Sequence, residues 1–174
     1  MIEKQSVSVG LINPKSPNNV GSVMRAAGNY RVDSIFYTGK RYPRALIRNK
    51  DLPDMHRNVS KNVPLSEVSD FIHEAPPDLK MVCIEFAENA TPLTEYQHPD
   101  NAFYVFGPED GTISQAIIDK ADAVVYVPTV GCMNLAATVN VVLYDRLAKS
   151  KQNFSSEELI RESRDTNNRL KVKR

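Results

Sequence analysis

Hydrophobic residues along the chain form short continuous runs that alternate with longer stretches of helical periodicity. The short runs predict strands at 7–12, 34–37, 81–86, 102–106 and 123–127. Helical spacing predicts helices from about 19 to 30, from about 112 onward and from 133 to about 149, with shorter helices at 66–72 and after Ser155. Strands that are apolar throughout are typical of a parallel sheet covered on both faces. The pattern therefore predicts an α/β fold, a mostly parallel sheet with helices on both faces.

Length and composition are those of a globular domain. With 174 residues, 41% of them hydrophobic, the chain can bury one core, which we assign to residues 1–150. Residues 151–174 are rich in basic side chains and poor in apolar ones, so we expect a partly disordered C-terminal extension. No signal peptide or apolar run of membrane-spanning length is seen, which predicts a cytoplasmic protein without a membrane partner. Cys83 and Cys132 are far apart and lack clustered histidines, so neither a disulfide nor a metal site is expected.

The basic residues are distributed unevenly, although the net charge is only +1. Segment 39–61 holds seven lysines and arginines against two aspartates, with a tyrosine and a histidine interleaved. Such a mixture suits RNA contact, while the simpler interpretation is solvated surface. The candidate RNA-binding residues are Lys40, Arg41, Arg44, Arg48 and Arg57.

The loop after the first predicted strand combines asparagines, prolines and a glycine before an arginine. Asn19 is either an ordinary helix cap or a functional amide, and Arg25 is either a surface residue or a catalytic one. Gly21 near the start of a helix carries a cost relative to alanine, which favours close approach of another group. Gly21 and Arg25 are expected to share a helix face.

Two further loops follow predicted strands and lead into helices. The first, residues 106–111, places Glu109 beside two glycines and a proline, where a plain turn would not need a carboxylate. The second, residues 127–137, contains Gly131, Cys132 and Asn134. No histidine lies in these loops to activate Cys132, so we interpret this cysteine as pocket lining. All three loops are expected at the carboxyl ends of parallel strands, where ligands bind.

Taken in order, these motifs resemble those of the SpoU (TrmH-like) family of RNA 2′-O-ribose methyltransferases, within the SPOUT class. Residues 19–25 match its N-x-G-x-x-x-R motif, residues 106–109 its F-G-P-E motif and residues 132–135 its S-x-N-type motif. The chain departs from many relatives in carrying Cys132 where they have serine. Its compact length is similar to the minimal, single-domain branch of the family.

The resemblance implies a C-terminal trefoil knot, a homodimer and S-adenosylmethionine as cofactor. It implies that Arg25 is catalytic, fixing a phosphate and stabilising the developing alkoxide, while Asn19, Glu109 and Asn134 hold Arg25 and the loops in place. Close backbone approach to the cofactor would account for the glycines at 107 and 131. The implied cofactor-binding residues are Phe86, Gly107, Val127, Gly131, Cys132 and Leu135.

The reaction implied by the resemblance is 2′-O-methylation of a ribose in RNA. A small structured target such as tRNA is favoured over rRNA because the chain has no separate recognition domain. Two alternatives stay open: a catalytically silent RNA-binding module on the same fold, and an α/β enzyme acting on a small acidic metabolite. Salt-sensitive RNA binding would separate the metabolite enzyme from the other two.

Overall fold

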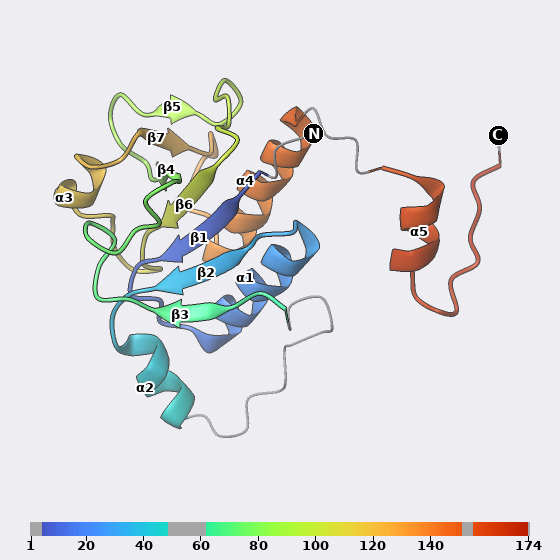
Figure 1. Ribbon diagram of the computed structural model, residues 1–174, viewed down its shortest axis with the longest axis horizontal. Coiled ribbons are helices and arrows are strands. Elements are labelled where there is room, and N and C mark those ends of the chain that lie inside the picture. Colours follow the sequence, from blue (N-terminus) through green and yellow to red (C-terminus); the bar gives the residue numbers. More distant parts are fainter. Residues whose placement is uncertain (1–4, 49–61, 151–154, 174) are drawn as a thin grey trace.

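The predicted strands lie in one sheet in which neighbouring strands run parallel. The computed structural model describes residues 5–48, 62–150 and 155–173. Within these residues the strand order is β3-β2-β1-β6-β4-β7-β5 (Figure 1). The strands are β1 Val7–Leu11, β2 Ser34–Tyr37, β3 Leu65–Glu67, β4 Lys80–Ile84, β5 Thr91–Pro92, β6 Ala102–Phe106 and β7 Ala123–Tyr126. The five predicted strands are confirmed to within two residues at each end.

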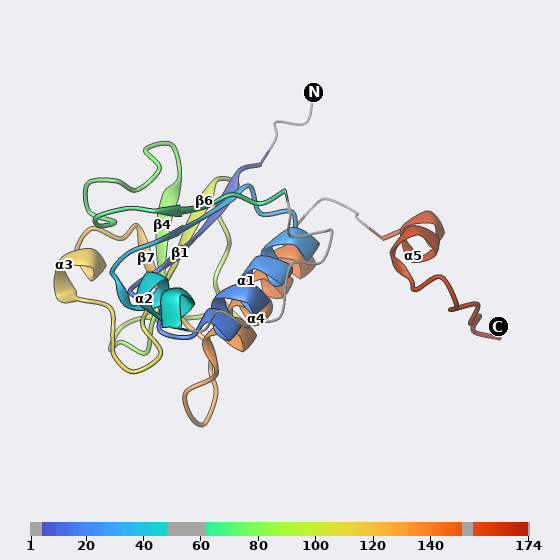
Figure 2. The ribbon, with the colours of Figure 1, turned by 90° about the horizontal axis from the view of Figure 1, so that it is seen from below.

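Helices cover the two faces of the sheet unequally. The helices are α1 Pro17–Asn29, α2 Arg41–Arg48, α3 Gln115–Ile118, α4 Leu135–Lys149 and α5 Glu157–Ser163. Helices α1 and α4 pack against each other on one face, while the short α3 lies on the other (Figure 2). The predicted α/β fold with helices on both faces is thereby confirmed, and the turns around Phe71 complete the cover of the α3 face.

Alternate residues of each strand supply two separate cores, as the pleat of a strand requires. Leu11 and Tyr104 point to the α1–α4 face and are fully buried there. Phe103 and Val105, their neighbours on the other side of the sheet, are equally buried beneath α3 and the 68–79 turns. Burial on both faces explains why the strands read as continuous apolar runs.

Three elements differ from the sequence-based expectation. Residues 41–48, where no helix or strand was predicted, form helix α2, which has no fully buried residue; its Tyr42 packs against the core while partly exposed. Residues 66–72, expected to be helical, form the end of β3 and turns, because Leu65–Glu67 pair with β2 at the sheet edge. Helix α3 begins at Gln115 rather than near Thr112, since the amide of Ile113 is held by Glu85 instead of entering a helix.

A buried polar cluster lies where α4 crosses the segment between β5 and β6. The His98 ring is 5% exposed; its Nδ1 lies 2.6 Å from the Tyr104 hydroxyl and its Nε2 lies 2.9 Å from Asp145 Oδ2. Arg146 Nη1 donates to the same hydroxyl at 3.1 Å, and Lys149 pairs with Asp145 at 2.7 Å. Every polar group in this cluster thus has a partner, as burial demands.

The C-terminal helix α5 lies apart from the sheet in both views (Figures 1 and 2). Ser156 caps it by accepting a hydrogen bond from the Leu159 amide, at the position where the sequence predicted a short helix. Ile160, Leu170 and Val172 are exposed. None of the helices in the described part of the chain is long and apolar enough to cross a membrane.

Candidate functional site

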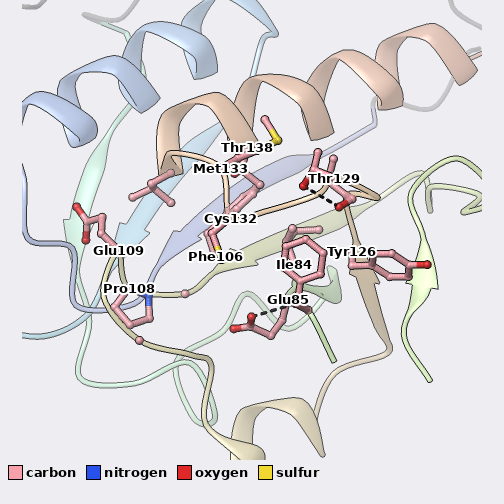
Figure 3. Close-up of a pocket in the computed structure, with 15 residues that line it drawn as sticks. Ile84, Glu85, Phe106, Pro108, Glu109, Tyr126, Thr129, Cys132, Met133 and Thr138 are labelled. Atoms are coloured by element: carbon pink, nitrogen blue, oxygen red, sulfur yellow. Dashed lines mark hydrogen bonds between the residues drawn. The ribbon is translucent and has the colours of Figure 1, made fainter. Parts of the chain in front are cut away.

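A pocket opens at the carboxyl ends of β4, β6 and β7, as expected for a parallel sheet. Figure 3 shows its walls, which enclose a cavity of about 140 Å³. Among the described residues, the lining is apolar apart from two carboxylates, two threonines and the tyrosine Tyr126, and it contains no lysine, arginine or histidine. The lining residues are Ile84, Glu85, Phe86, Phe106, Gly107, Pro108, Glu109, Gly111, Tyr126, Val127, Thr129, Cys132, Met133, Leu135 and Thr138.

Most residues that the sequence analysis assigned to cofactor binding meet at this pocket. Phe86, Gly107, Val127, Cys132 and Leu135 all line it. Gly131 does not: it is exposed in the loop, and a Cβ added there would meet nothing within 4 Å. At Gly107 an added Cβ would come within 3.3 Å of Glu85 Oε2 and of Ile113 Cγ1. The packing around Gly107 thus accounts for that glycine, whereas no close approach by another described residue accounts for Gly131.

Glu109 joins the second loop to the first. Its Oε2 accepts a hydrogen bond from the Lys15 amide at 2.9 Å, and its Oε1 accepts one from the Ser16 amide at 3.0 Å. Asn19 Nδ2 donates to the same Oε1 at 3.3 Å. Burial favours a raised pKa for Glu109, but backbone hydrogen bonds, including those of Ser16 and Lys15, and the Asn19 amide outweigh it and lower the pKa. The carboxylate is therefore held in its charged form.

Asn134 joins the third loop to the first. Its Nδ2 donates to Asn19 Oδ1 at 3.0 Å, while its Oδ1 caps α4 by accepting from the amides of Ala136 and Ala137. Asn19 thus lies between Glu109 and Asn134 and bonds to both. The three loops that the sequence singled out are connected through these side chains, which we call the Glu109–Asn19–Asn134 chain.

Arg25 stands on the exposed face of α1. No hydrogen bond or ion pair links it to another described residue, so the expectation that Asn19, Glu109 and Asn134 hold Arg25 in place is wrong for the described chain. Gly21 and Arg25 lie four residues apart within α1, so they share a helix face as expected, with Gly21 buried and Arg25 exposed. A free guanidinium at this position is available to a ligand or partner.

Glu85, which the sequence analysis did not select, shapes the floor of the pocket. Its Oε2 accepts from the Ile113 amide at 2.8 Å and its Oε1 from the Phe86 amide at 3.0 Å (Figure 3). The carboxylate therefore ties the end of β4 to the loop before α3. Its sequence signal is a charged residue inside the apolar run at 81–86, next to the carboxyl end of a strand.

The basic candidates are not equivalent. Lys40 forms an ion pair with Glu67, and Arg41 is bonded to Asn13 and Asp110. Arg44 and Arg48 are exposed on α2. Arg57 lies outside the described residues.

The two cysteines have opposite surroundings. Cys83 is fully buried in the sheet, and burial, with a smaller contribution from Glu85, raises the pKa of its thiol to about 12. Cys132 is exposed at the pocket, where no histidine lines the walls. Across residues 5–48, 62–150 and 155–173, no three His, Cys, Asp or Glu side chains form a group that could hold a metal ion.

Several known proteins are similar to this chain. A model of the SpoU rRNA Methylase family matches residues 6–144, which include all three loops. The tRNA (cytidine-2′-O-)-methyltransferase TrmJ of Methanocaldococcus jannaschii is 30% identical over 166 residues, covering 84% of this chain and 70% of that protein.

Solved structures share the fold at low sequence identity. The A. aeolicus TrmH/SpoU tRNA modifying enzyme is similar with a TM-score of 0.70 and 17% identity, over 91% of this chain and 85% of that one. The SpoU methyltransferase AviRb from Streptomyces viridochromogenes, in complex with AdoMet, is similar with a TM-score of 0.64 and 17% identity, over 86% and 59% of the two chains.

Proposed function

The chain belongs to the SpoU rRNA Methylase family, and on this premise we propose that it methylates the 2′-hydroxyl of a ribose in RNA, using S-adenosylmethionine. The observation that carries the proposal is the Glu109–Asn19–Asn134 chain beside the pocket, because it connects the three motif loops. A catalytically silent RNA-binding module would not need this arrangement next to a cavity.

The pocket suits this cofactor chemically. S-adenosylmethionine carries a positive sulfonium group, and the lining residues include the carboxylates of Glu85 and Glu109, of which Glu109 also lies 3.8 Å from Arg41 Nη2. Phe86 and Leu135 offer apolar surface of the kind that an adenine ring requires. The bound cofactor would supply an electrophilic methyl group. Gly107, Val127 and Cys132 would hold the cofactor through the strand-end loops. Gly131 lies in the loop of Cys132 but does not line the pocket.

Arg25 is the residue we assign to the reacting ribose. An exposed guanidinium with no partner among the described residues can contact the phosphate next to the target nucleotide and stabilise negative charge on the attacking oxygen. A guanidinium keeps its proton in proteins, so Arg25 is a poor proton acceptor. Asn19, Glu109 and Asn134 act indirectly by fixing the loops that orient the reactants, and such orientation supplies much of the rate in a transfer between two bound groups.

We infer that the RNA is a tRNA. Its relative from Methanocaldococcus jannaschii is described as a tRNA (cytidine-2′-O-)-methyltransferase, and the match covers 84% of this chain and 70% of that protein. The exposed Arg44 and Arg48 supply positive charge for the backbone of the RNA, with Lys40 beside them. A homodimer, a trefoil knot and a cytoplasmic location belong to the same proposal, and light scattering of the purified protein tests the dimer.

The proposal is tested by methyl transfer from labelled S-adenosylmethionine to total tRNA and, separately, to rRNA. Both RNA pools come from cells that lack this protein, and nucleoside mass spectrometry identifies the product. We expect a ribose-methylated nucleoside from tRNA with the wild-type protein and its loss with Arg25→Ala. Binding of RNA without any transfer would support the silent module, and absence of cofactor binding would overturn the methyltransferase proposal.

A further inference from the structure

The side chain of Arg41, at the start of α2, points inward to the motif loops. Its Nε and Nη2 both donate to the carbonyl oxygen of Asn13, at 3.0 and 2.7 Å. Its Nη1 donates to both carboxylate oxygens of Asp110, at 2.7 and 2.9 Å, and its Nη2 lies 3.8 Å from Glu109 Oε2. One guanidinium therefore contacts the first and second motif loops together.

These contacts close a ring around the first loop. Arg41 holds the loop by its Asn13 carbonyl, while Glu109 holds it by the amides of Lys15 and Ser16. Arg41 and Glu109 are in turn linked through Asp110, the neighbour of Glu109 in the chain. Two donors and one acceptor of the loop backbone are thus occupied, which restrains the conformation of the loop.

The backbone around Arg41 is adapted to this contact. Gly39 has a φ of +79°, and a Cβ there would lie 2.3 Å from Asn13 Oδ1, so another residue at 39 would displace Asn13. The Asn13 amide donates to Thr38 Oγ1 at 3.2 Å, which fixes the connection after β1 to the connection after β2. The Asn13 carbonyl is thereby presented to Arg41.

We propose that Arg41 is a positioning residue for methyl transfer, which sets the conformation of the first and second motif loops, instead of a residue whose main contact is the RNA. The inference rests on the proposed function. Pro108 and Glu109, whose loop Arg41 restrains, line the cofactor pocket, and Glu109 leads through Asn19 to Asn134. Displacement of this loop would therefore move walls of the cofactor pocket and also the side chains that connect the motif loops beside the ribose.

The other arginines of α2 serve as controls because their surroundings differ. The side chain of Arg41 is 32% exposed and three of its nitrogens have partners, whereas the exposed Arg44 and Arg48 make no side-chain hydrogen bond to another described residue. A phosphate contact needs charge and access, which lysine keeps. The two-sided contact of Arg41 needs a planar guanidinium, which lysine lacks.

The experiment compares Arg41→Lys with Arg44→Lys and Arg44→Ala. For Arg41→Lys we expect kcat at saturating tRNA to fall about 10-fold or more, with KM for tRNA changed by less than about twofold. Arg44→Ala should raise KM for tRNA and lower the salt dependence of binding, with a smaller effect on kcat than Arg41→Lys has. Arg44→Lys keeps the positive charge, so it should raise KM for tRNA less than Arg44→Ala does. Asp110→Asn combined with Arg41→Lys should lower kcat little further than either change alone, because both break one contact.

Amide hydrogen exchange supplies a readout that needs neither RNA nor cofactor. The amides of Lys15 and Ser16 should exchange about 10-fold faster in Arg41→Lys and at the wild-type rate in Arg44→Lys. Unchanged exchange and kcat in Arg41→Lys, with an Arg41→Ala variant that raises KM as Arg44→Ala does, would overturn the proposal. Absence of methyl transfer by the wild type would count against the proposed function, while faster exchange would still support the positioning contact.

Discussion

Asn134 Nδ2 donates to Asn19 Oδ1 at 3.0 Å, across 115 residues of sequence. The other end of the same amide, Oδ1, accepts from the first free amides of α4. Asn134 thus starts a helix and connects two loops with opposite ends of one group. A substitution at this position can therefore remove the contact with Asn19 and keep the cap of α4.

Asn134→Asp should separate these two roles. Aspartate keeps an oxygen to cap α4, so the free energy of unfolding should stay within about 0.5 kcal/mol of wild type. It replaces the donor to Asn19 with an acceptor, and rotating the Asn19 amide would only move the mismatch to Glu109. We expect methyl transfer to fall about 10-fold, a typical cost of removing a supporting hydrogen bond at a site.

Asn134→Ala removes both roles and should also lower the free energy of unfolding by about 1 kcal/mol. Urea unfolding and steady-state kinetics measure the two effects. Ser156→Ala is the control, because Ser156 caps α5 away from the pocket and should leave methyl transfer unchanged. Full activity in Asn134→Asp would show that the Asn19–Asn134 contact has no role in the reaction.

Glu109 should make stability depend on pH in the acidic range. The pKa of this carboxyl is lowered on folding. Its contribution to the free energy of unfolding is therefore complete above the unfolded pKa of about 4.5 and is lost as the pH falls through the lower pKa of the folded state. Unfolding by urea between pH 3 and 6 should therefore show a weaker pH dependence for Glu109→Gln than for wild type. The exposed Glu88→Gln serves as control, and equal slopes for all three proteins would contradict the prediction.

His98 should make the free energy of unfolding depend on pH in a higher range, near neutrality. Burial lowers the pKa of His98 more than the hydrogen bond and charge of Asp145 raise it. The positive charges of Arg146 and Lys149 lower it further. The folded protein then binds fewer protons than the unfolded chain. The contribution of His98 to the free energy of unfolding is therefore complete above about pH 6.5 and is lost as the pH falls below that value.

Replacing His98 by glutamine should flatten this dependence between pH 5 and 7. It should also cost about 1–3 kcal/mol at pH 7.5, because the Tyr104 hydroxyl and Asp145 lose a buried partner. Thermal unfolding across this pH range measures both effects. His73 has an exposed ring, so His73→Gln should retain the wild-type dependence; a flat wild-type profile would refute the role of His98.

The two cysteines should react with iodoacetamide at very different rates. At pH 8 a thiol with a pKa of about 12 is ionised in about one molecule in 10,000, and Cys83 is buried as well, whereas Cys132 is exposed. Mass spectrometry should therefore find the label on Cys132 alone. S-adenosylmethionine should slow this labelling because Cys132 lines the pocket. Labelling in urea is the control, where both thiols should react; equal labelling of the folded protein would contradict the prediction.

The sequence predicted the strands and the meeting of the three loops because both depend on strong local signals. Runs such as 102–106 are apolar throughout, and a parallel sheet brings the carboxyl ends of its strands to one edge. Helix α2 was missed because it has no fully buried residue, and its contacts with the rest of the fold come from Arg41 and the partly buried Tyr42. Strand β3 was mistaken for a helix because three residues at an edge are too few to show alternation.

Long-range contacts account for what remained unseen at the site. Nothing near Arg41 in the sequence shows that its partners are Asn13 and Asp110, 28 and 69 residues away. Likewise Glu85 is recognisable as a polar residue at a strand end, but its bond to the Ile113 amide depends on how the loop before α3 folds back. Such contacts follow from the assembled sheet and have no local pattern.

The strand order also has a consequence during protein synthesis. Strand β1 pairs with β6, and Val7 meets Ala102, 95 residues later in the chain. At about 5–20 residues per second, a ribosome takes roughly 5 to 19 s to produce the chain between them. Through this interval Val9 and Leu11, which are fully buried in the folded protein, can be paired on one edge only, by β2. A nascent chain stalled before β6 therefore presents an open apolar strand edge, which is where aggregation of this protein in cells should begin.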